Sequence, residues 1–409
     1  MRMRVLRFAA LPTLAAALWA AGLTAQSTTT QTPAPAASTT AAQAATTSAA
    51  QAAPTEPARA IAAPKTPLPA EAASAGVTKF SFIAYGDTRG RHDGEQLEAE
   101  HTLVVDSMLA TIKRLSTTAF PVKYVIQSGD AVVNGRDGKQ LNVSYIPIIE
   151  RLTKGADVPY FFTAGNHDVT AATDLKDAER AKGLKNLLDA NKNLMPAEGS
   201  PRRLNGYPTY AFGYGNTFMI AFDSQVAPDE TQFNWVKAQL EGLDRKRYVH
   251  VIAFMHHPPF SSGPHGNASV ALEAATVAVR DKYEPLFRQH HVRMTIAGHE
   301  HLFEHWVERY EDASGKHRMD HIVSGGGGAP LYTYQGEPTT KDFLADKARK
   351  DAKVALEHLV KPGVNAGDNP YHYLVVQIDG DNVSVDVVGV DWGNNFKPYK
   401  SAGTKIGGS

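Results

Sequence analysis

Five apolar runs of strand length, each ending in polar side chains that can bind a metal, constrain this 409-residue chain more than any other feature. The runs are KFSFIAYGD, VKYVIQSGD, VPYFFTAGNHD, YVHVIAFMHHPP and VRMTIAGHEH, and most place a glycine just before the polar ending. In open α/β sheets the carboxyl ends of parallel strands meet at one edge, where ligands bind. The pattern therefore predicts that the polar endings converge on one site: Asp87, Asp130, Asn166 to Asp168, His256 with His257, and His299 with His301.

Stretches with helical patterning separate these runs, and this alternation indicates an α/β fold. We expect helices over residues 97–115, 141–154, 231–243 and 271–289. The charged segment 340–360 favours a helical surface insertion. Residues 371–391 alternate in polarity around a turn at 379–382, which predicts a β-hairpin.

The first 76 residues differ in composition from the rest. A basic start, an apolar stretch too short for a good membrane span, and Ala25 at a plausible cleavage point predict a signal peptide over residues 1–25, with an uncleaved anchor as the alternative. Residues 26–76 are rich in Ala, Thr, Pro, Ser and Gln, contain no aromatic residue, and predict a disordered linker. A folded domain then spans 77–395 and a tail spans 396–409. We expect a periplasmic or secreted protein that is not stably inserted in a membrane.

Charge and cysteine content narrow the possible functions. Lys and Arg total 42 and Asp and Glu total 42, so nothing in the net charge of +0 points to nucleic acid as a partner. The absence of cysteine excludes disulfides, thiolate metal sites and cysteine nucleophiles. The ligands of any metal are therefore His, Asp, Glu, Asn or backbone groups, which suit Mn, Fe or Zn.

The polar endings suit a pair of metal ions. Six donors with one bridging carboxylate fit two ions about 3.5–4 Å apart, and such a pair activates a shared water and holds a phosphoryl group during attack. These donors are Asp87, Asp130, Asn166, His256, His299 and His301. The glycine-rich segment SGGGGAPLY at 324–332 lacks the lysine of a P-loop and predicts a tight turn near this site.

The series GD, GD, GNHD, H-x-P and GHEH, in that order, resembles the calcineurin-like metallophosphoesterases over roughly residues 77–392. The resemblance implies a four-layer αββα sandwich of two mixed sheets flanked by helices. It also implies two metal ions (Mn, Fe or Zn) and a small phosphoester substrate. The implied reaction is hydrolysis of phosphomonoesters or phosphodiesters by metal-bound hydroxide.

The same resemblance implies a role for each residue. Asp130 would bridge both metals. The first metal would be held by Asp87 and His301, and the second by Asn166, His256 and His299. His167 would contact the phosphate or protonate the leaving group, oriented by Asp168.

The first motif departs from the family pattern. Many members carry Asp-x-His there, with the histidine as a ligand, whereas this chain has Arg89. Arg89 would then clamp a substrate phosphate, or the first metal would recruit His92 or His101 or be weakly held. Purple acid phosphatases also lack that histidine and use a tyrosine three residues after the bridging aspartate. Val133 stands at that position, so a purple iron site is not supported.

A second class of function uses the same residues. A non-catalytic metal-binding or ligand-binding protein on this fold would have lost its first metal through Arg89. The retention of Asp87, Asp130 and His301 favours an enzyme. The fold does not define the substrate.

Overall fold

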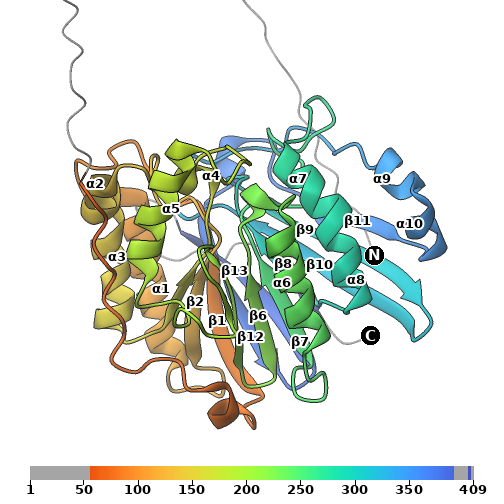
Figure 1. The fold of residues 1–409 in the computed structure, drawn as a ribbon, viewed down its shortest axis with the longest axis horizontal. Coiled ribbons are helices and arrows are strands. Elements are labelled where there is room, and N and C mark those ends of the chain that lie inside the picture. The colour runs from red at the N-terminus through yellow and green to blue at the C-terminus, as the bar shows by residue number, and fades with distance from the viewer. Residues whose placement is uncertain (1–55, 391–403, 407–409) are drawn as a thin grey trace, which may run out of the picture. The chain divides into compact units, whose positions relative to one another are not determined.

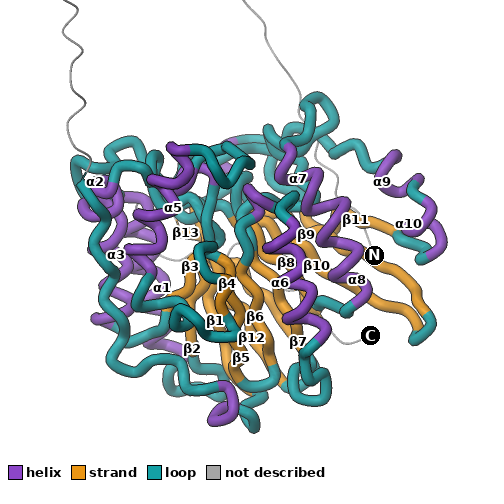
Figure 2. The backbone as a smooth tube through the Cα atoms, viewed as in Figure 1, coloured by secondary structure: helices purple, strands orange, loops and turns teal. Residues whose placement is uncertain are grey.

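The computed structural model describes residues 56–390 and the backbone of residues 404–406. These residues form two mixed β-sheets that pack face to face, with helices on the outer face of each sheet (Figure 1). Figure 2 shows the strands in the middle and helices on both sides. The predicted four-layer αββα sandwich is confirmed.

The first sheet has the order β14-β13-β12-β1-β2-β3. β1, β2 and β3 run parallel, and β12 pairs antiparallel with β1 and with β13. The predicted hairpin of residues 371–391 is formed by β12 and β13, and Gly380 in its turn has a φ of 61°. The strands are β1 (Lys79–Tyr85), β2 (Val122–Gln127), β3 (Tyr160–Phe162), β12 (Tyr371–Asp379), β13 (Asn382–Val390) and β14 (Thr404–Ile406).

The second sheet has the order β11-β9-β10-β8-β7-β6-β5-β4. Its centre, from β10 through β8 and β7 to β6, is parallel, and its two sides are antiparallel. The strands are β4 (Arg203–Leu204), β5 (Thr209–Tyr214), β6 (Thr217–Ala221), β7 (His250–Phe254), β8 (Met294–Ala297), β9 (Phe303–Asp312), β10 (Gly315–Ser324) and β11 (Ala355–Val360).

Ten α-helices are described in residues 56–390. They are α1 (Ala99–Leu115), α2 (Gly138–Gln140), α3 (Ile146–Glu150), α4 (Asn166–Val169), α5 (Ala178–Asn191), α6 (Glu230–Glu241), α7 (Ala274–Ala278), α8 (Glu284–Gln289), α9 (Lys341–Ala345) and α10 (Lys347–Asp351). Turns of π-helix over Leu141–Tyr145, Arg151–Gly155 and Val279–Tyr283 join several of them. None of the helices in this part of the chain has the length and apolar character that crossing a membrane requires.

Side-chain alternation along the strands builds the layers, because successive residues of a strand point to opposite faces. In β1, Phe80 and Phe82 point into the core between the two sheets, whereas Ile83 and Tyr85 point into the core under α1, α3 and α5. The outer face of the second sheet packs on α6 and α8 through a third core. Every central strand is therefore covered on both faces, which explains the near-continuous apolar runs of the sequence.

Most predicted elements are present within a few residues. The structure corrects segment 340–360, where helix is confined to α9 and α10, and Ala355–Val360 forms β11, paired with β9. β11 alternates between exposed and half-buried residues, which is typical of an edge strand. Helix α5 was not predicted from the sequence.

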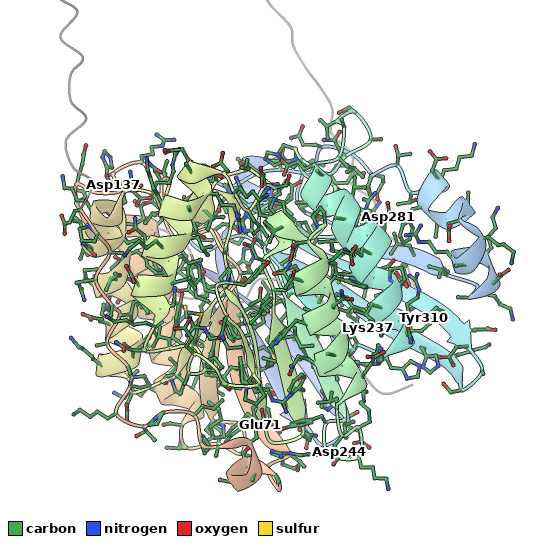
Figure 3. All side chains as sticks on the ribbon, viewed as in Figure 1. Glu71, Asp137, Lys237, Asp244, Asp281 and Tyr310 are labelled. Carbon is green, nitrogen blue, oxygen red and sulfur yellow. The ribbon has the colours of Figure 1, made fainter. Side chains whose placement is uncertain are left out.

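The linker prediction is wrong for residues 56–76, which pack on the domain. Ile61 is fully buried, and its N–H donates to the Ala190 carbonyl at 2.8 Å. Glu71, labelled in Figure 3, accepts from Arg202 Nε at 2.8 Å and Tyr248 Oη at 2.8 Å. The average composition of the segment concealed these few anchors. The predicted signal peptide, the linker up to residue 55 and the boundary at residue 395 lie outside the described residues.

Candidate metal centre

The predicted polar endings come together where the parallel strands of both sheets end. Asp87 follows β1, Asp130 follows β2, and Asn166 begins α4 after β3. From the second sheet, His256 follows β7, and His299 and His301 follow β8. The His299 N–H donates to Asp87 Oδ2 at 3.0 Å, and His256 Nδ1 lies 2.9 Å from the Ser128 carbonyl. These two contacts join the edges of the two sheets.

The backbone at this edge adopts unusual conformations. Asp87, Asp130 and His299 have φ values of 60°, 58° and 71°, a backbone region that residues other than glycine seldom adopt. Such strain concentrates at functional sites, where the surrounding structure enforces it. Gly129 has a φ of 102°, and a Cβ there would lie 2.8 Å from His256 Nδ1. The glycine before Asp130 is therefore required by both conformation and space.

One set of donor atoms, called the second donor group here, consists of Asn166 Oδ1, His256 Nε2, His299 Nδ1 and Asp130 Oδ1. Asn166 Oδ1 lies 3.0 Å from His256 Nε2 and 3.2 Å from His299 Nδ1. The two imidazole nitrogens are 3.3 Å apart, and Asp130 Oδ1 lies 3.4 Å from His256 Nε2. Four donors from four chain segments thus face one small volume.

The histidines of this group present lone pairs rather than protons. His256 Nδ1 donates to the Ser128 carbonyl, so its Nε2 turns an unprotonated face to the group. Burial lowers the pKa of His256 well below its ordinary value, and burial beside His257 lowers the pKa of His299 to about 4. Neutral imidazoles are the form that binds metals.

The first donor group consists of Asp87, His301 and Asp130 Oδ2. One ligand atom from each residue lies within 4.8 Å of the others, and His301 Nε2 is 3.6 Å from Asp87 Oδ1. His301 Nδ1 donates to the Pro330 carbonyl at 2.7 Å, which turns Nε2 inward. Burial, with Asp130 nearby, raises the pKa of Asp87 well above its ordinary value.

Arg89 reaches into the first donor group. Its Nε lies 3.3 Å from Asp130 Oδ2, and its Nη2 lies 3.3 Å from His301 Nε2. The predicted substitute ligands lie elsewhere. His101 is buried in the core with Nε2 3.1 Å from Tyr85 Oη, and His92 is exposed beside Glu95. Neither histidine takes the place of the missing ligand.

The structure corrects the relation between His167 and Asp168. His167 Nδ1 donates to the Val133 carbonyl at 2.8 Å, so this carbonyl, and not Asp168, orients the ring. The Asp168 carboxylate accepts backbone N–H groups from Gly165 at 2.8 Å, Asp130 at 2.8 Å and Ala131 at 2.9 Å. Asp168 therefore ties the loop after β2 to the start of α4 and has a positioning role.

Glu273 is part of the centre and was missed in the sequence. Its carboxylate lies 3.4 Å from His257 Nε2, 3.2 Å from His265 Nδ1 and 3.3 Å from His299 Nε2. Carboxylates behind ligand histidines fix the ring orientation and raise ligand basicity. Glu273 precedes α7 and follows a loop rather than an apolar run, so the strand-end pattern could not reveal it.

The glycine-rich segment lies at the centre, as predicted. A Cβ on Gly325 would lie 2.8 Å from Asp87 Oδ2, so the backbone passes close to the first donor group. At the end of the segment, the Tyr332 ring stacks on His301 with centroids 4.2 Å apart. The segment follows β10 of the second sheet and contacts a donor from each sheet, Asp87 and His301.

The donor sets fit metal ions to different degrees. The second donor group combines two neutral imidazoles, an amide oxygen and a carboxylate, a set that suits Mn, Fe or Zn. The first donor group has a carboxylate and an imidazole of its own and shares Asp130. Its inward atoms face a guanidinium.

The middle of the sequence matches a known protein family. The sequence model of the calcineurin-like phosphoesterase family matches residues 104–303. The chain carries a calcineurin-like phosphoesterase domain. The resemblance seen in the sequence is confirmed, although the match begins after Asp87 and Arg89.

The phosphoesterase domain is similar to plant enzymes. It is 29% identical over 174 residues to probable purple acid phosphatase 20 of Arabidopsis thaliana, covering 42% of this chain and 38% of that protein. It is 26% identical over 150 residues to Fe(3+)-Zn(2+) purple acid phosphatase 12 of the same plant, covering 36% and 29%. The chain therefore spans well under two thirds of the length of these relatives.

Solved structures show the same fold. Purple acid phosphatase PPD1 from yellow lupin (Lupinus luteus) seeds superposes with a TM-score of 0.55 at 15% identity, covering 77% of this chain and 52% of that one. The structure of PhoD gives 0.50 at 11% identity, covering 81% and 70%. Despite this similarity, the residue three positions after Asp130 is Val133, whose side chain has no atom that can bind a metal. The prediction against a purple iron site stays a prediction.

Proposed function

We propose that the phosphoesterase domain is a metal-dependent hydrolase of small phosphomonoesters or phosphodiesters. The observation that carries the proposal is the second donor group, in which Asn166, His256 and His299 place donor atoms 3.0–3.3 Å from one another and Asp130 Oδ1 lies 3.4 Å from His256 Nε2. Neutral donors at such spacing are arranged for a cation. The family match and the similarity to purple acid phosphatases support phosphoric esters as the substrate class.

A bound ion supplies Lewis acidity toward a phosphoryl oxygen and makes a water acidic enough to attack near neutral pH. Asn166, His256, His299 and Asp130 would hold it. Asp130 is positioned for this by the His167 N–H, which donates to its Oδ1 at 2.9 Å. Three backbone N–H groups, of Gly165, Asp130 and Ala131, donate to the Asp168 carboxylate. These hydrogen bonds hold the loop that carries Asp130 against the start of α4, where Asn166 lies.

Arg89 would bind the substrate anion. Its side chain is 17% exposed, and two of its guanidinium nitrogens contact Asp130 and His301. Of the three guanidinium nitrogens of Arg89, only Nη1 has no hydrogen-bond partner among the described residues. This nitrogen is therefore left for a phosphate oxygen. A fixed guanidinium stabilises charge that develops on phosphorus in the transition state.

His167 would move a proton at Nε2. Its Nδ1–H is committed to the Val133 carbonyl, so Nε2 is the nitrogen that can take up a proton and pass it to a leaving group. The side chain is half-buried, in reach of a ligand. The absence of an Asp168 contact means that the ring relies on a neutral carbonyl for its orientation.

Export is also part of the proposal. The basic and apolar residues 1–25, with Ala25 at their end, support cleavage and release outside the cytoplasm. Amino-terminal sequencing of protein recovered from the periplasm or medium tests this. A mature chain that starts at residue 26 supports export, and a full-length chain retained in the cytoplasm contradicts it.

The test of activity is hydrolysis of a matched aryl phosphate monoester and diester by the full chain loaded with Mn. We expect metal-dependent turnover that Asn166→Ala abolishes, falling by a factor of about 10³ or more because a catalytic ion is lost. The faster ester then defines the subclass. Metal-loaded, folded protein that hydrolyses neither ester would contradict the proposal and favour a binding protein.

A further inference from the structure

The two donor groups differ in whether a cationic side chain of the protein contacts their donor atoms. In the second donor group, Asn166 contacts His256 and His299, His256 lies beside Asp130 Oδ1, and no Arg or Lys of the described part of the chain contacts the three donors other than Asp130. In the first donor group, two of the three donors already contact a cation, because Arg89 Nε faces Asp130 Oδ2 and Arg89 Nη2 faces His301 Nε2.

The bridging carboxylate shows this division most directly. Asp130 Oδ1 faces the second donor group, and Asp130 Oδ2 lies 3.3 Å from Arg89 Nε. A carboxylate that bridges two ions presents one oxygen to each. Here one oxygen lies beside a lone-pair donor, His256 Nε2, and the other faces a guanidinium, which has no lone pair to offer a metal.

The lone pair of His301 leads to the same conclusion. Its Nδ1–H is committed to the Pro330 carbonyl, so Nε2 is the only nitrogen that could bind an ion. That nitrogen lies 3.3 Å from Arg89 Nη2, a donor with no lone pair. An ion placed between Asp87 and His301 would have to displace the guanidinium and would be repelled by it.

We propose that Arg89 takes the place of a metal ion in the first donor group, so that the centre binds one ion tightly, at the second donor group. The proposal rests on the proposed function for its catalytic meaning. In it, the Asp130 carboxylate is shared between an ion and a guanidinium, so the chain itself supplies one of the two cations of the centre. Arg89 is then a catalytic residue when its remaining nitrogen contacts the phosphate.

The experiment counts metal and measures coupling. Chelator-treated full-length protein is incubated with excess Mn²⁺ and desalted, its metal content is measured by mass spectrometry, and its EPR spectrum is recorded. Two adjacent Mn²⁺ ions give an exchange-coupled spectrum, whereas distant ions do not. Coupling is the decisive readout, because the exposed cluster of His291, Asp312 and His317 has donor atoms within 4.8 Å and would add uncoupled metal.

Two variants of Arg89 make the test specific. Arg89→Lys keeps a cation, and Arg89→His replaces it with a neutral donor. We expect uncoupled Mn²⁺ in the native protein and in Arg89→Lys, and one additional, coupled ion per chain in Arg89→His. Thermal unfolding of each metal-free variant verifies that it is folded.

A coupled pair in the native protein would overturn the proposal. So would a folded Arg89→His variant that gains no coupled ion, because Arg89 would then not be what excludes the metal. Neither readout depends on turnover. A centre with one uncoupled ion that hydrolyses no phosphoester would therefore contradict only the proposed function.

Discussion

The two donor groups share one carboxylate but reach opposite electrostatic arrangements. The second donor group brings lone-pair donors close to one another, whereas in the first donor group the donors contact Arg89. The difference teaches that ligand identity does not define occupancy. Asp87 and His301 are as suitable for a metal as Asn166 and His256, but one neighbouring guanidinium changes what they bind.

Removing a ligand from the second donor group gives the largest expected effect. Asn166→Ala should weaken Mn²⁺ binding by more than about 100-fold, beyond the range seen for residues behind the ligands. Asn166 Oδ1 lies within 3.2 Å of both imidazole nitrogens, so it is central to the group. Isothermal titration calorimetry measures the affinity. An unchanged affinity in the folded variant would place the tight site elsewhere.

Asp168 holds both donor groups in place through the loop that carries Asp130. Asp168→Asn exchanges one acceptor oxygen for a donor amide, which leaves a buried N–H unpaired and should lower the free energy of unfolding by about 2 kcal/mol. Urea denaturation of metal-free protein measures it. Asp177→Asn, at the N-cap of α5, is the matched control and should cost a few tenths, because Asn also caps helices well. Equal losses in both variants would contradict the positioning role.

Glu273 acts on the second donor group alone. Glu273→Gln should weaken Mn²⁺ binding about tenfold, the low end for a carboxylate behind a ligand histidine, because its side chain is 39% exposed to solvent. Glu337→Gln is a matched control, since Glu337 pairs with His358 outside the centre. Equal affinities for the native protein and Glu273→Gln would show that His299 needs no such support.

Asp87 should have the smallest effect on the tight ion. Asp87→Asn keeps an oxygen for the His299 N–H and removes only a donor of the first group. We expect Mn²⁺ affinity within about threefold of native, a smaller effect than that of a carboxylate behind a ligand histidine, because Asp87 gives no donor atom to the second donor group. Calorimetry on the same preparation as Asn166→Ala gives the direct comparison. Loss of the tight ion in Asp87→Asn would show that the groups are not separate.

The strand ends show how far the sequence could lead. Asp87, Asp130, Asn166, His256, His299 and His301 could be predicted because parallel strands bring their carboxyl ends to one edge, whatever lies between them in the chain. The layered fold could be predicted as well, because strands that are covered on both faces have near-continuous apolar sequences.

What the sequence did not reveal depends on side chains that arrive from loops. Glu273 comes from the start of a short helix, and the contacts of Arg89 depend on which atoms face it. Asp168 was assigned to His167 by resemblance, but backbone N–H groups compete for its carboxylate. Residues 56–76 are held by anchors such as Ile61 that an average over composition conceals.

Anomalous diffraction from crystals of the native protein grown with Mn²⁺ tests the central claim most directly. The account predicts one strong manganese peak, among Asn166, His256, His299 and Asp130, with the Arg89 guanidinium between Asp130 and His301. A second peak of similar height between Asp87 and His301, with Arg89 turned away, would contradict it.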